Sequence, residues 1–318
     1  MLQVISLCYP QHLQKIKQEE AVAAIGFFDG IHKGHQKVIK EAQVLAKQQN
    51  RKSAVITFSP HPSVVLNNNK QDVHYLTPLS EKQSILADMG IDLLYIIAFD
   101  HTLSQLSPKA FIDHFIIGLN IKHLVTGFDF TYGHKGKGNI HTLAADAAGC
   151  FEITVIDKLE NENEKVSSTR IRELLVQGNV EKVTELMDRP LTTSGTVIEG
   201  EKRGRTIGYP TANIDPDQAY AIPKAAVYGV KVWVKEHCVY GMANIGYKPT
   251  FHDKNESSQL TVEVHLFDFN QAIYGEQVKI EWRVFIREEQ KFTGIDALIN
   301  QLKQDEQRIR QFFSLITD

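Results

Sequence analysis

The chain has 318 residues, 42% of them hydrophobic and 23% charged, which is an ordinary composition for a globular protein. At the usual ~100–200 residues per domain, this length favours two domains. A formal net charge of −3 gives no global basic field, so we expect no nucleic-acid partner. The three cysteines lie far apart with no CxxC pair, which is typical of a protein from a reducing compartment.

The beginning of the chain and its apolar runs give no sign of export or membrane insertion. The segment MLQVISLCYP lacks the basic n-region of a signal peptide, and Pro10 interrupts it. No apolar run approaches the ~18 residues that a transmembrane helix requires. We therefore expect a soluble cytoplasmic protein without a membrane partner.

The first half of the chain alternates apolar strands with amphipathic helices. Strands are predicted at residues 21–26, 53–58, 92–99, 123–130 and 151–157, and helices at residues 35–49, 80–90, 107–119, 168–178 and 179–187. This alternation implies a parallel sheet with helices on both faces. The ligand crevice of such a sheet lies at the carboxyl ends of its strands.

The pattern changes at residues 187–195. After Pro190, short β-type runs separated by turn residues predict a small antiparallel barrel, and an amphipathic helix at residues 294–316 ends the chain. The apolar face of this helix carries Ile295, Leu298, Ile299, Leu302, Ile309, Phe312 and Phe313. We therefore predict an α/β domain at residues 1–187 and a six-stranded antiparallel β-barrel domain with a terminal helix at residues 188–318.

The stretch GFFDGIHKGH, residues 26–35, lies where a predicted strand gives way to a predicted helix. At such a junction the backbone N–H groups and the helix dipole favour an anion. Gly30 permits a tight turn, and Gly34 lacks a side chain that would hold a ligand away. His32 and His35 can point the same way and donate hydrogen bonds to phosphate oxygens. The pattern favours nucleotidyl transfer, in which positioning and electrostatics supply most of the rate.

Other interpretations of the two histidines are weaker. An isolated HxxH is more often two exposed residues on a first helical turn, but the glycines and the strand–helix junction argue against that here. Zinc would need further ligands, and HxxH lacks the HExxH spacing. The segment GTVIEGEK lacks the Gly-Lys-Ser/Thr of a Walker A motif, and the protein-kinase signatures are absent.

Three further stretches of the first half fit the same crevice. FSPHP follows a strand, and its His61 can contact a phosphate, although alone it would be a Pro-rich turn. GFDFTYGHKGKG either stacks its Phe128, Phe130 and Tyr132 on a planar ring or forms a surface hairpin. VSSTRIR places three hydroxyl residues at the start of a helix, where they either are plain N-caps or bind a ligand. Its Arg170 lies where it can bind a triphosphate.

The second half has its own candidate residues. GEKRGRTIGYPTANI is a flexible basic loop that can fold over phosphates. Its Thr211 and Asn213 alternate on a predicted strand, so both side chains point the same way. Two oxygen ligands on one face suit Mg²⁺ held together with nucleotide phosphates. NIGYKPTF, residues 244–251, reads as a Gly/Pro turn. In LTVEVHLFDF, Val262 and Val264 are predicted to be buried and Glu263 to face the other way. Glu263 is either a solvent-facing strand residue or a general base for a hydroxyl nucleophile.

Together these motifs resemble the prokaryotic bifunctional riboflavin kinase/FAD synthetase family, in order and over nearly the whole chain. The first half resembles its Rossmann-like adenylyltransferase module, and the second half its riboflavin kinase module. The resemblance implies that riboflavin and ATP give FMN in the second module, and that FMN and ATP give FAD and pyrophosphate in the first. It implies Mg²⁺ as cofactor and small-molecule partners only. It gives no oligomeric state.

The resemblance also implies roles for individual residues. His32 and His35 would bind the ATP phosphates and stabilise the transition state, and Glu263 would take the proton of the riboflavin 5′-hydroxyl. Thr211 and Asn213 would bind Mg²⁺ with ATP. The ATP- or flavin-binding residues would be Gly26, Phe27, Asp29, Gly34, His61, Asp129, Ser168, Thr169, Arg170, Gly204, Arg205 and Gly208.

Two positions depart from the family pattern. Ala226 stands where glycine is usual before Val-Tyr, and Ser59 where an acidic residue is common before Pro-His-Pro. Neither is a catalytic position, but Ala226 bears on how well the kinase module binds its substrates. The alternatives are therefore a paralogue with one active module and a non-catalytic flavin-binding regulator. The intact His32, His35 and Glu263 argue against the regulator.

Overall fold

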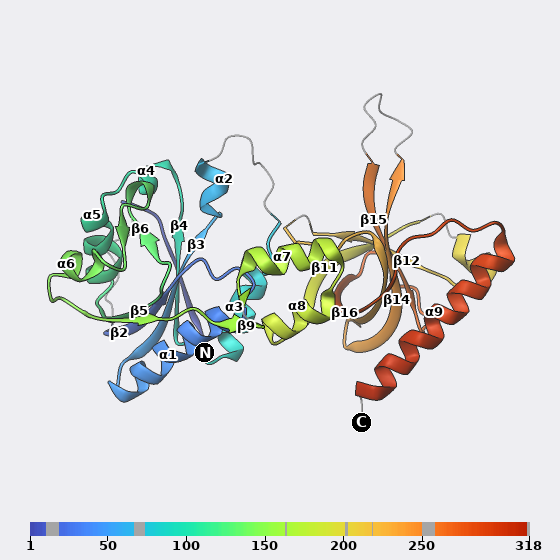
Figure 1. The fold of residues 1–318 in the computed structure, drawn as a ribbon, viewed down its shortest axis with the longest axis horizontal. Coiled ribbons are helices and arrows are strands. Elements are labelled where there is room, and N and C mark those ends of the chain that lie inside the picture. Colours follow the sequence, from blue (N-terminus) through green and yellow to red (C-terminus); the bar gives the residue numbers. More distant parts are fainter. Residues whose placement is uncertain are drawn as a thin grey trace. The chain divides into compact units, whose positions relative to one another are not determined.

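The computed structural model describes residues 1–10, 19–66, 74–162, 164–200, 203–217, 219–249 and 258–316. The chain divides into two compact units, Met1–Ser168 and Thr169–Asp318. Figure 1 shows an α/β unit followed by a β-barrel with a long terminal helix, which confirms the predicted fold class.

The first unit is built on a six-stranded sheet in which every strand runs parallel to its neighbours, in the order β1-β4-β3-β2-β5-β8. Its strands are β1 (Gln3–Leu7), β2 (Ala21–Ile25), β3 (Lys52–Ser59), β4 (Leu93–Ala98), β5 (Ile121–Gly127) and β8 (Glu152–Ile156). All five residues of β2 are buried, because this strand lies inside the sheet with a helical layer on each face.

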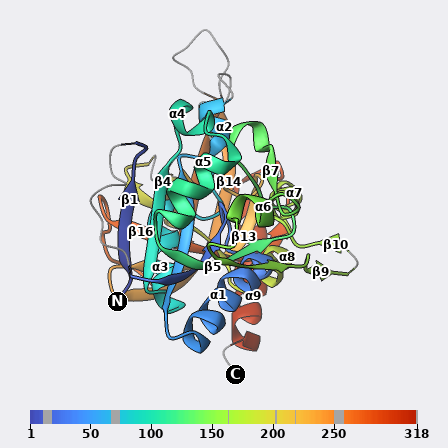
Figure 2. The same ribbon diagram turned by 90° about the vertical axis from the view of Figure 1, so that its left-hand side faces the viewer.

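Helices cover both faces of this sheet (Figures 1 and 2). They are α1 (Lys33–Gln48), α2 (Pro62–Leu66), α3 (Leu79–Asp88), α4 (His101–Ser104), α5 (Pro108–Ile112), the π-helical turn Asp113–Ile117 and α6 (Leu143–Ala147). One hydrophobic cluster joins Val22 and Ala24 of β2 to α1 and α3. The alternate residues Ala21, Ala23 and Ile25 join the cluster that contains α5 and α6. The predicted three-layer arrangement is thus confirmed.

Strand β1 and the hairpin after β8 are not predicted from the sequence, whereas the hairpin after β5 is one of the two alternatives predicted for residues 127–138. Strand β1 lies at the edge of the sheet beside β4, and only its last residue, Leu7, is buried, so its apolar pattern is weak. Two short hairpins follow the carboxyl ends of β5 and β8. They pair β6 (Thr131–Tyr132) with β7 (Gly138–Asn139), and β9 (Glu160–Asn161) with β10 (Glu164–Lys165).

The second unit contains the predicted six-stranded antiparallel barrel, which closes in the order β11-β12-β15-β14-β13-β16. Its strands are β11 (Leu191–Ile198), β12 (Ala212–Pro216), β13 (Ala226–Val234), β14 (His237–Pro249), β15 (Ser258–Leu266) and β16 (Gln277–Arg287). Trp282 fills the interior, where its indole N–H donates to Thr193 Oγ1 at 2.9 Å. Residues 244–249 end strand β14, so the predicted Gly/Pro turn is wrong there, and residues 250 and 251 lie outside the described residues.

The terminal helix α9 (Ile295–Ile316) buries only part of its apolar face against the barrel. Ile309 and Phe313 lie in a hydrophobic cluster with strand residues, and the Phe313 ring stacks on Tyr240 at 4.1 Å between centroids. Ile295, at the other end of the predicted apolar face, is 65% exposed. The first turns of α9 therefore present apolar side chains to a space that the barrel does not fill.

Helices α7 (Ser168–Gln177) and α8 (Val180–Met187) precede the barrel. The division between the two compact units falls inside α7, after its first residue. Helix α8 packs on β16 and β11, and the Glu181 carboxylate accepts a hydrogen bond from the Phe285 N–H at 3.2 Å. The boundary at residues 187 and 188 stays a prediction, and the packing of α8 provides a way to test it.

We expect a fragment of residues 169–318 to be more stable than one of residues 188–318. The longer fragment keeps the buried face of α8, which carries Val180, Val183, Leu186 and Met187. At ~1.5–3 kcal/mol for each fully buried large side chain, this difference amounts to several kcal/mol. Urea unfolding followed by tryptophan fluorescence measures it in both fragments. Equal unfolding midpoints would show that α8 adds nothing to the barrel.

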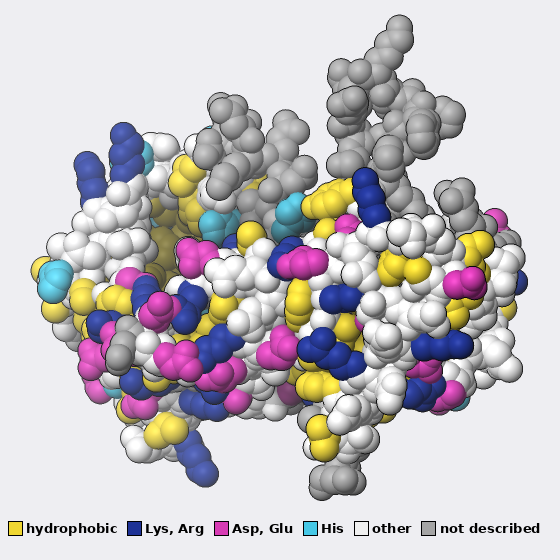
Figure 3. Space-filling model, turned by 45° about the vertical axis from the view of Figure 1, so that its right-hand side comes forward, with side chains coloured by type: hydrophobic (Ala, Val, Ile, Leu, Met, Phe, Trp, Pro, Cys, Tyr) yellow, Lys and Arg dark blue, Asp and Glu magenta, His cyan; other side chains and the backbone are white. Residues whose placement is uncertain are grey.

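Among the described residues, no helix is both long and apolar enough to cross a membrane. On the face shown in Figure 3, basic and acidic side chains are intermixed, in line with the small net charge.

Candidate active sites

The turn between β2 and α1, residues 26–32, lies at the topological switch point of the sheet. The strands that follow β2 in the chain are added first on its β3 side and later on its β5 side. Strand β2 has β3 on one side and β5 on the other, so the carboxyl ends of these three strands meet at one edge. The predicted stretches that follow them are thereby brought together. The rings of Phe27 and His61, for example, lie edge to face with centroids 4.3 Å apart. Parallel sheets bind ligands at such a switch point.

The backbone of this turn is strained. Phe28 and Ile31 have φ angles of 52° and 37°, in the left-handed region, and Gly30 has a φ angle of 88°. Strained non-glycine residues cost about 1–3 kcal/mol each and persist only where their surroundings hold them. The buried Asp29 carboxylate accepts hydrogen bonds from the backbone N–H groups of Leu76 and Thr77, at 3.3 and 3.0 Å.

Ser168 contributes to the same turn. Its Oγ donates to the Asp29 carbonyl at 2.8 Å, so the start of α7 is joined to the strained backbone. Asp29 and Ser168, both predicted to bind ATP or flavin, thus also hold the turn in place. Thr169 and Arg170 follow on α7, with Thr169 exposed and Arg170 half-buried.

The His32 and His35 imidazoles are stacked, with ring centroids 3.6 Å apart and an interplanar angle of 21°. His32 is the N-cap of α1, and its Nδ1 accepts the backbone N–H of His35 at 3.3 Å. In the neutral ring the proton must therefore be on Nε2, which can donate to a ligand. A Cβ on Gly34 would lie 3.1 Å from the His32 ring and crowd it. Glycine at this position therefore allows the imidazole to lie where it does.

Both histidines are neutral near pH 7. Burial lowers the pKa of His32 to about 4, against a smaller opposite effect of Asp29. The pKa of His35 is also held well below its usual value. Burial is the largest cause, and smaller contributions come from His32 and from the cations of Lys82 and Lys165. The His35 Nδ1 is buried and has no hydrogen-bond partner among the described residues. The pair therefore offers neutral N–H donors rather than fixed positive charges.

Asp129 follows β5 at the same edge and is exposed. Its carboxylate pairs with the Lys165 ammonium at 2.7 Å, and that ammonium also lies 4.6 Å from the centre of the Phe128 ring. Phe128 and Phe130 are half-buried, whereas Tyr132 is buried and donates its hydroxyl to Asp146. The interpretation of Tyr132 as a stacking platform for a ligand is therefore wrong, and the stretch forms the alternative hairpin. Figure 3 shows a hollow in this unit with hydrophobic side chains inside it and a histidine nearby.

The low pKa of His32 makes the stability of the first unit depend on pH. Between about pH 4 and 6.5 the unfolded chain binds more protons at this position, so stability falls as the pH drops through that window. The loss is on the order of 3 kcal/mol at about 1.4 kcal/mol per pKa unit. In a His32→Asn variant, the amide oxygen can still cap α1 but does not titrate, so we expect a weaker pH dependence.

Urea unfolding at several pH values measures this effect. Both tryptophans, Trp233 and Trp282, lie in the second unit, so their fluorescence serves as an internal control while circular dichroism also reports the helices of the first unit. An identical pH dependence in the wild type and the variant would contradict the assignment to His32.

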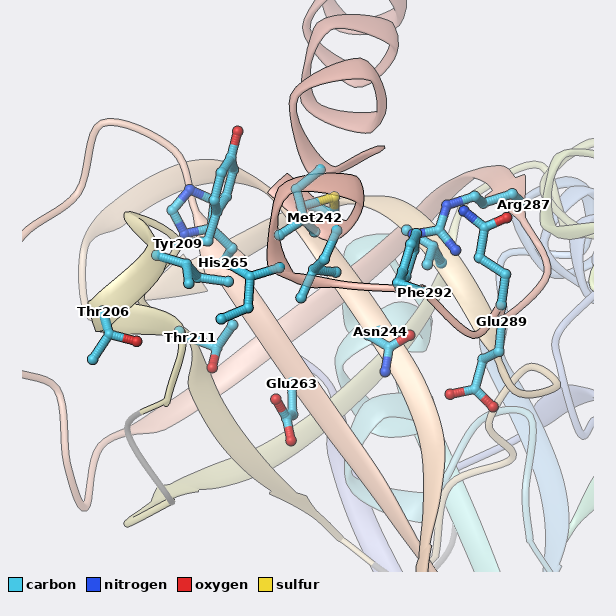
Figure 4. A pocket seen from close by; sticks show the side chains of 17 residues that line it. Thr206, Tyr209, Thr211, Met242, Asn244, Glu263, His265, Arg287, Glu289 and Phe292 are labelled. Atoms are coloured by element: carbon cyan, nitrogen blue, oxygen red, sulfur yellow. The ribbon is translucent and has the colours of Figure 1, made fainter. Parts of the chain in front are cut away.

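The second unit holds a cavity of about 720 Å³ between the outer face of the barrel and the first turns of α9. In Figure 4, Thr211, Glu263, Asn244 and Glu289 lie along one side of this cavity. Tyr209, His265, Met242 and Phe292 lie on the side nearer to the helix, and Leu298 and Leu302 of α9 complete the apolar lining. One wall therefore suits a flat apolar ligand and the other its polar, reacting end.

Strand register places Glu263 in the middle of a polar row. Its β15 position is directly opposite Asn213 of β12 on one side and Asn244 of β14 on the other. Val262 and Val264 are buried, as predicted, so Glu263 points out of the barrel into the cavity. Asn244 is not singled out by the sequence, because only the pairing of β14 with β15 brings it beside Glu263.

Thr211 and Asn213 occupy different surroundings. Thr211, just before β12, lines both the large cavity and a neighbouring one of about 370 Å³. Asn213 lines a third cavity of about 310 Å³, and its side chain lies against Gly200, where a Cβ would clash with it. Both side chains provide oxygen atoms on the outer face of the barrel near Glu263.

The glycine-rich loop connects the first two cavities. Gly204 lies so close to the Tyr209 carbonyl that a Cβ would come within 2.1 Å of it, and Gly208 has a φ angle of 83°. Arg205 is exposed and lines the smaller cavity, where its guanidinium lies 3.4 Å from the Tyr274 hydroxyl.

Arg287 is a cavity residue that sequence reasoning misses. Its guanidinium donates to the buried Asp305 carboxylate of α9 at 2.9 and 2.8 Å. Gln301 donates to the other oxygen of Asp305 at 2.9 Å. This pair between the half-buried Arg287 and the buried Asp305 fixes α9 to the end of β16 beside the cavity, and no local spacing in the sequence indicates it.

Comparison with known proteins identifies the family to which this chain belongs. The family model of FAD synthetase matches residues 14–170, and that of riboflavin kinase matches residues 187–313. A bifunctional riboflavin kinase/FMN adenylyltransferase of Listeria monocytogenes is 46% identical over 317 residues, covering 100% of both chains. That of Bacillus subtilis is 45% identical and covers 98% of this chain and 99% of its own. The chain belongs to the family of bifunctional riboflavin kinase/FMN adenylyltransferases.

The order of the two domains is therefore as predicted, with a FAD synthetase domain followed by a riboflavin kinase domain. A solved structure from Streptococcus pneumoniae, described as a macrolide-efflux protein, has the same overall fold with a TM-score of 0.87. It is 34% identical and covers 96% of this chain and 98% of that one.

Proposed function

We propose that the first unit transfers AMP from ATP to FMN at the turn between β2 and α1, giving FAD and pyrophosphate. The observation that carries this proposal is the stacked, neutral His32–His35 pair at the N-terminus of α1, at the switch point of the sheet. A helix N-terminus binds phosphates through its backbone N–H groups and its dipole. Asp129 and Phe128 after β5, and His61 after β3, supply further contacts to the two substrates.

In this mechanism a phosphate oxygen of FMN attacks the α-phosphorus of ATP, and the bond from that phosphorus to the departing pyrophosphate breaks. Negative charge grows on the leaving group and on the oxygens of the transferred phosphate. The Nε2–H of His32 and an N–H of His35 donate to these oxygens, and Arg170 supplies a cation for the triphosphate.

A His35→Ala variant should lose most FAD formation from FMN and keep riboflavin phosphorylation. Removing one donor to a transition-state oxyanion costs about 10²–10³ in rate. Chromatography of the flavin products measures both reactions in one sample, and the kinase reaction is the control for folding of the barrel. Near-normal FAD formation by the variant would refute the assignment.

We propose that the barrel phosphorylates riboflavin in the cavity of about 720 Å³ between its outer face and α9. The isoalloxazine ring lies against the apolar wall formed by α9, and the ribityl chain reaches the polar row at Glu263. Glu263 takes the proton of the 5′-hydroxyl as that oxygen attacks the γ-phosphorus of ATP, and ADP leaves. The cavity of about 370 Å³, bounded by the glycine-rich loop and Tyr274, receives the nucleotide.

The oxygen donors of Thr211 and Asn213 fit Mg²⁺, which prefers few protein ligands together with substrate phosphates. When bound, the ion would neutralise charge on the ATP phosphates. Ala226, the departure from the family pattern, is fully buried in β13 and does not line the large cavity. Its methyl group therefore leaves the proposed substrate sites unchanged, which favours two active modules.

A Glu263→Gln variant should lose riboflavin phosphorylation while FAD formation from added FMN continues. The amide keeps the shape of the side chain but cannot take a proton, and general-base catalysis is worth about 10²–10⁴ in rate. Initial rates with riboflavin, ATP and Mg²⁺, compared with rates from FMN, separate the two reactions. If the variant phosphorylates riboflavin normally, Glu263 is only a surface strand residue.

A further inference from the structure

Lys82 of α3 is a buried lysine that the mechanism above does not use. Its side chain is only 3% exposed, and lysines are almost never fully buried without a partner. Burial lowers its pKa to about 8, although the nearby Asp29 carboxylate acts in the opposite direction. An apolar side chain would fill this space without the desolvation cost of an ammonium. The presence of a buried cation at this position therefore indicates a role beyond packing.

The Lys82 ammonium contacts the strained turn from the side of α3. Its Nζ donates to the Phe27 carbonyl at 2.6 Å and lies 4.6 Å from the centre of the Phe27 ring. The Thr57 hydroxyl of β3 donates to the same carbonyl at 3.0 Å, and Lys82 Nζ lies 3.4 Å from that hydroxyl. The carbonyl that precedes the left-handed Phe28 is thus held by two donors from different elements.

We propose that Lys82 is a positioning residue for adenylyl transfer, which fixes the Phe27–Phe28 backbone and through it the stacked His32–His35 pair. It acts through the turn and does not touch the substrates. The connection continues on both sides of the turn, because the Asp29 carboxylate is bound to the backbone that precedes α3, and the Phe28 ring packs edge to face on His35 at 5.3 Å. This inference rests on the proposed adenylyl transfer.

The first test compares Lys82→Met with the wild type. A displacement of about 1 Å at a reacting group can cost on the order of 10² in rate, so we expect kcat for FAD formation to fall by about 10². The KM values for FMN and ATP should change by no more than about threefold, because the binding residues remain. Riboflavin phosphorylation in the same molecule should stay within about twofold of the wild type.

Lys47→Met is the matched control. Lys47 is exposed in the last turn of α1, at the opposite end of the helix from the histidines, so this variant should leave both activities unchanged. If the wild type makes no FAD, the proposed function itself fails. If it makes FAD and Lys82→Met retains kcat within about threefold, only the role of Lys82 is refuted.

A second variant separates positioning from a merely structural role. Lys82→Ala leaves a space next to the Phe27 carbonyl that methylammonium or ethylammonium can enter and where it can donate. We expect these amines to raise the FAD-forming rate of Lys82→Ala several-fold with saturation. Tetramethylammonium, which has the charge but no N–H group, should not raise it. Loss of FAD formation in both variants without rescue by the small amines, together with loss of helical circular dichroism, would show that Lys82 only stabilises the fold.

Discussion

The strained turn between β2 and α1 is the feature on which the first active site depends. Its left-handed residues are stable only because contacts from other elements hold them. These contacts come from Thr57 on β3, Leu76 and Thr77 before α3, Lys82 on α3 and Ser168 at the start of α7. The position of two imidazoles is thus set by four separate parts of the chain, and the site exists only when the unit is folded.

In the barrel the corresponding constraint is strand register. Side chains alternate between the two faces of a strand, so a shift of one residue in β15 would turn Glu263 into the interior and bring a valine to the cavity. Closure of the sheet fixes the pairing of β15 with β12 and β14 at the same time. The polar row Asn213, Glu263 and Asn244 follows directly from that pairing.

The sequence predicts those parts of the fold and of the sites that local patterns encode. The apolar alternation of LTVEVHLF is sufficient to point Glu263 away from the core, and the glycines around His32 and His35 indicate a strand–helix turn. Lys82 cannot be found this way, because a lysine in the first turns of an amphipathic helix normally faces solvent. Its burial results from α3 packing beside β3, which is a contact between segments distant in the sequence.

The same reason explains the other omissions. Arg287 and Asp305 form a pair across 18 positions, and Asn244 gains its place beside Glu263 only through strand pairing. Strand β1 lies at the edge of the sheet and is too weakly buried to show a clear apolar pattern. The Thr131–Asn139 hairpin follows β5 in a stretch rich in aromatic residues, which suits a ligand platform equally well, and only the burial of Tyr132 decides against that interpretation.

The protonation state of the histidine pair is central to the proposed adenylyl transfer. Two cationic imidazoles would bind the triphosphate strongly before reaction, and binding the ground state as tightly as the transition state does not raise kcat. Burial instead keeps His32 and His35 neutral, so that their N–H groups gain most as charge develops on the phosphate oxygens. The nearby cations are placed accordingly, with Lys82 directed at a backbone carbonyl and Lys165 paired with Asp129. Both lower the pKa of His35, so each helps to keep this donor neutral without having to contact the phosphates itself.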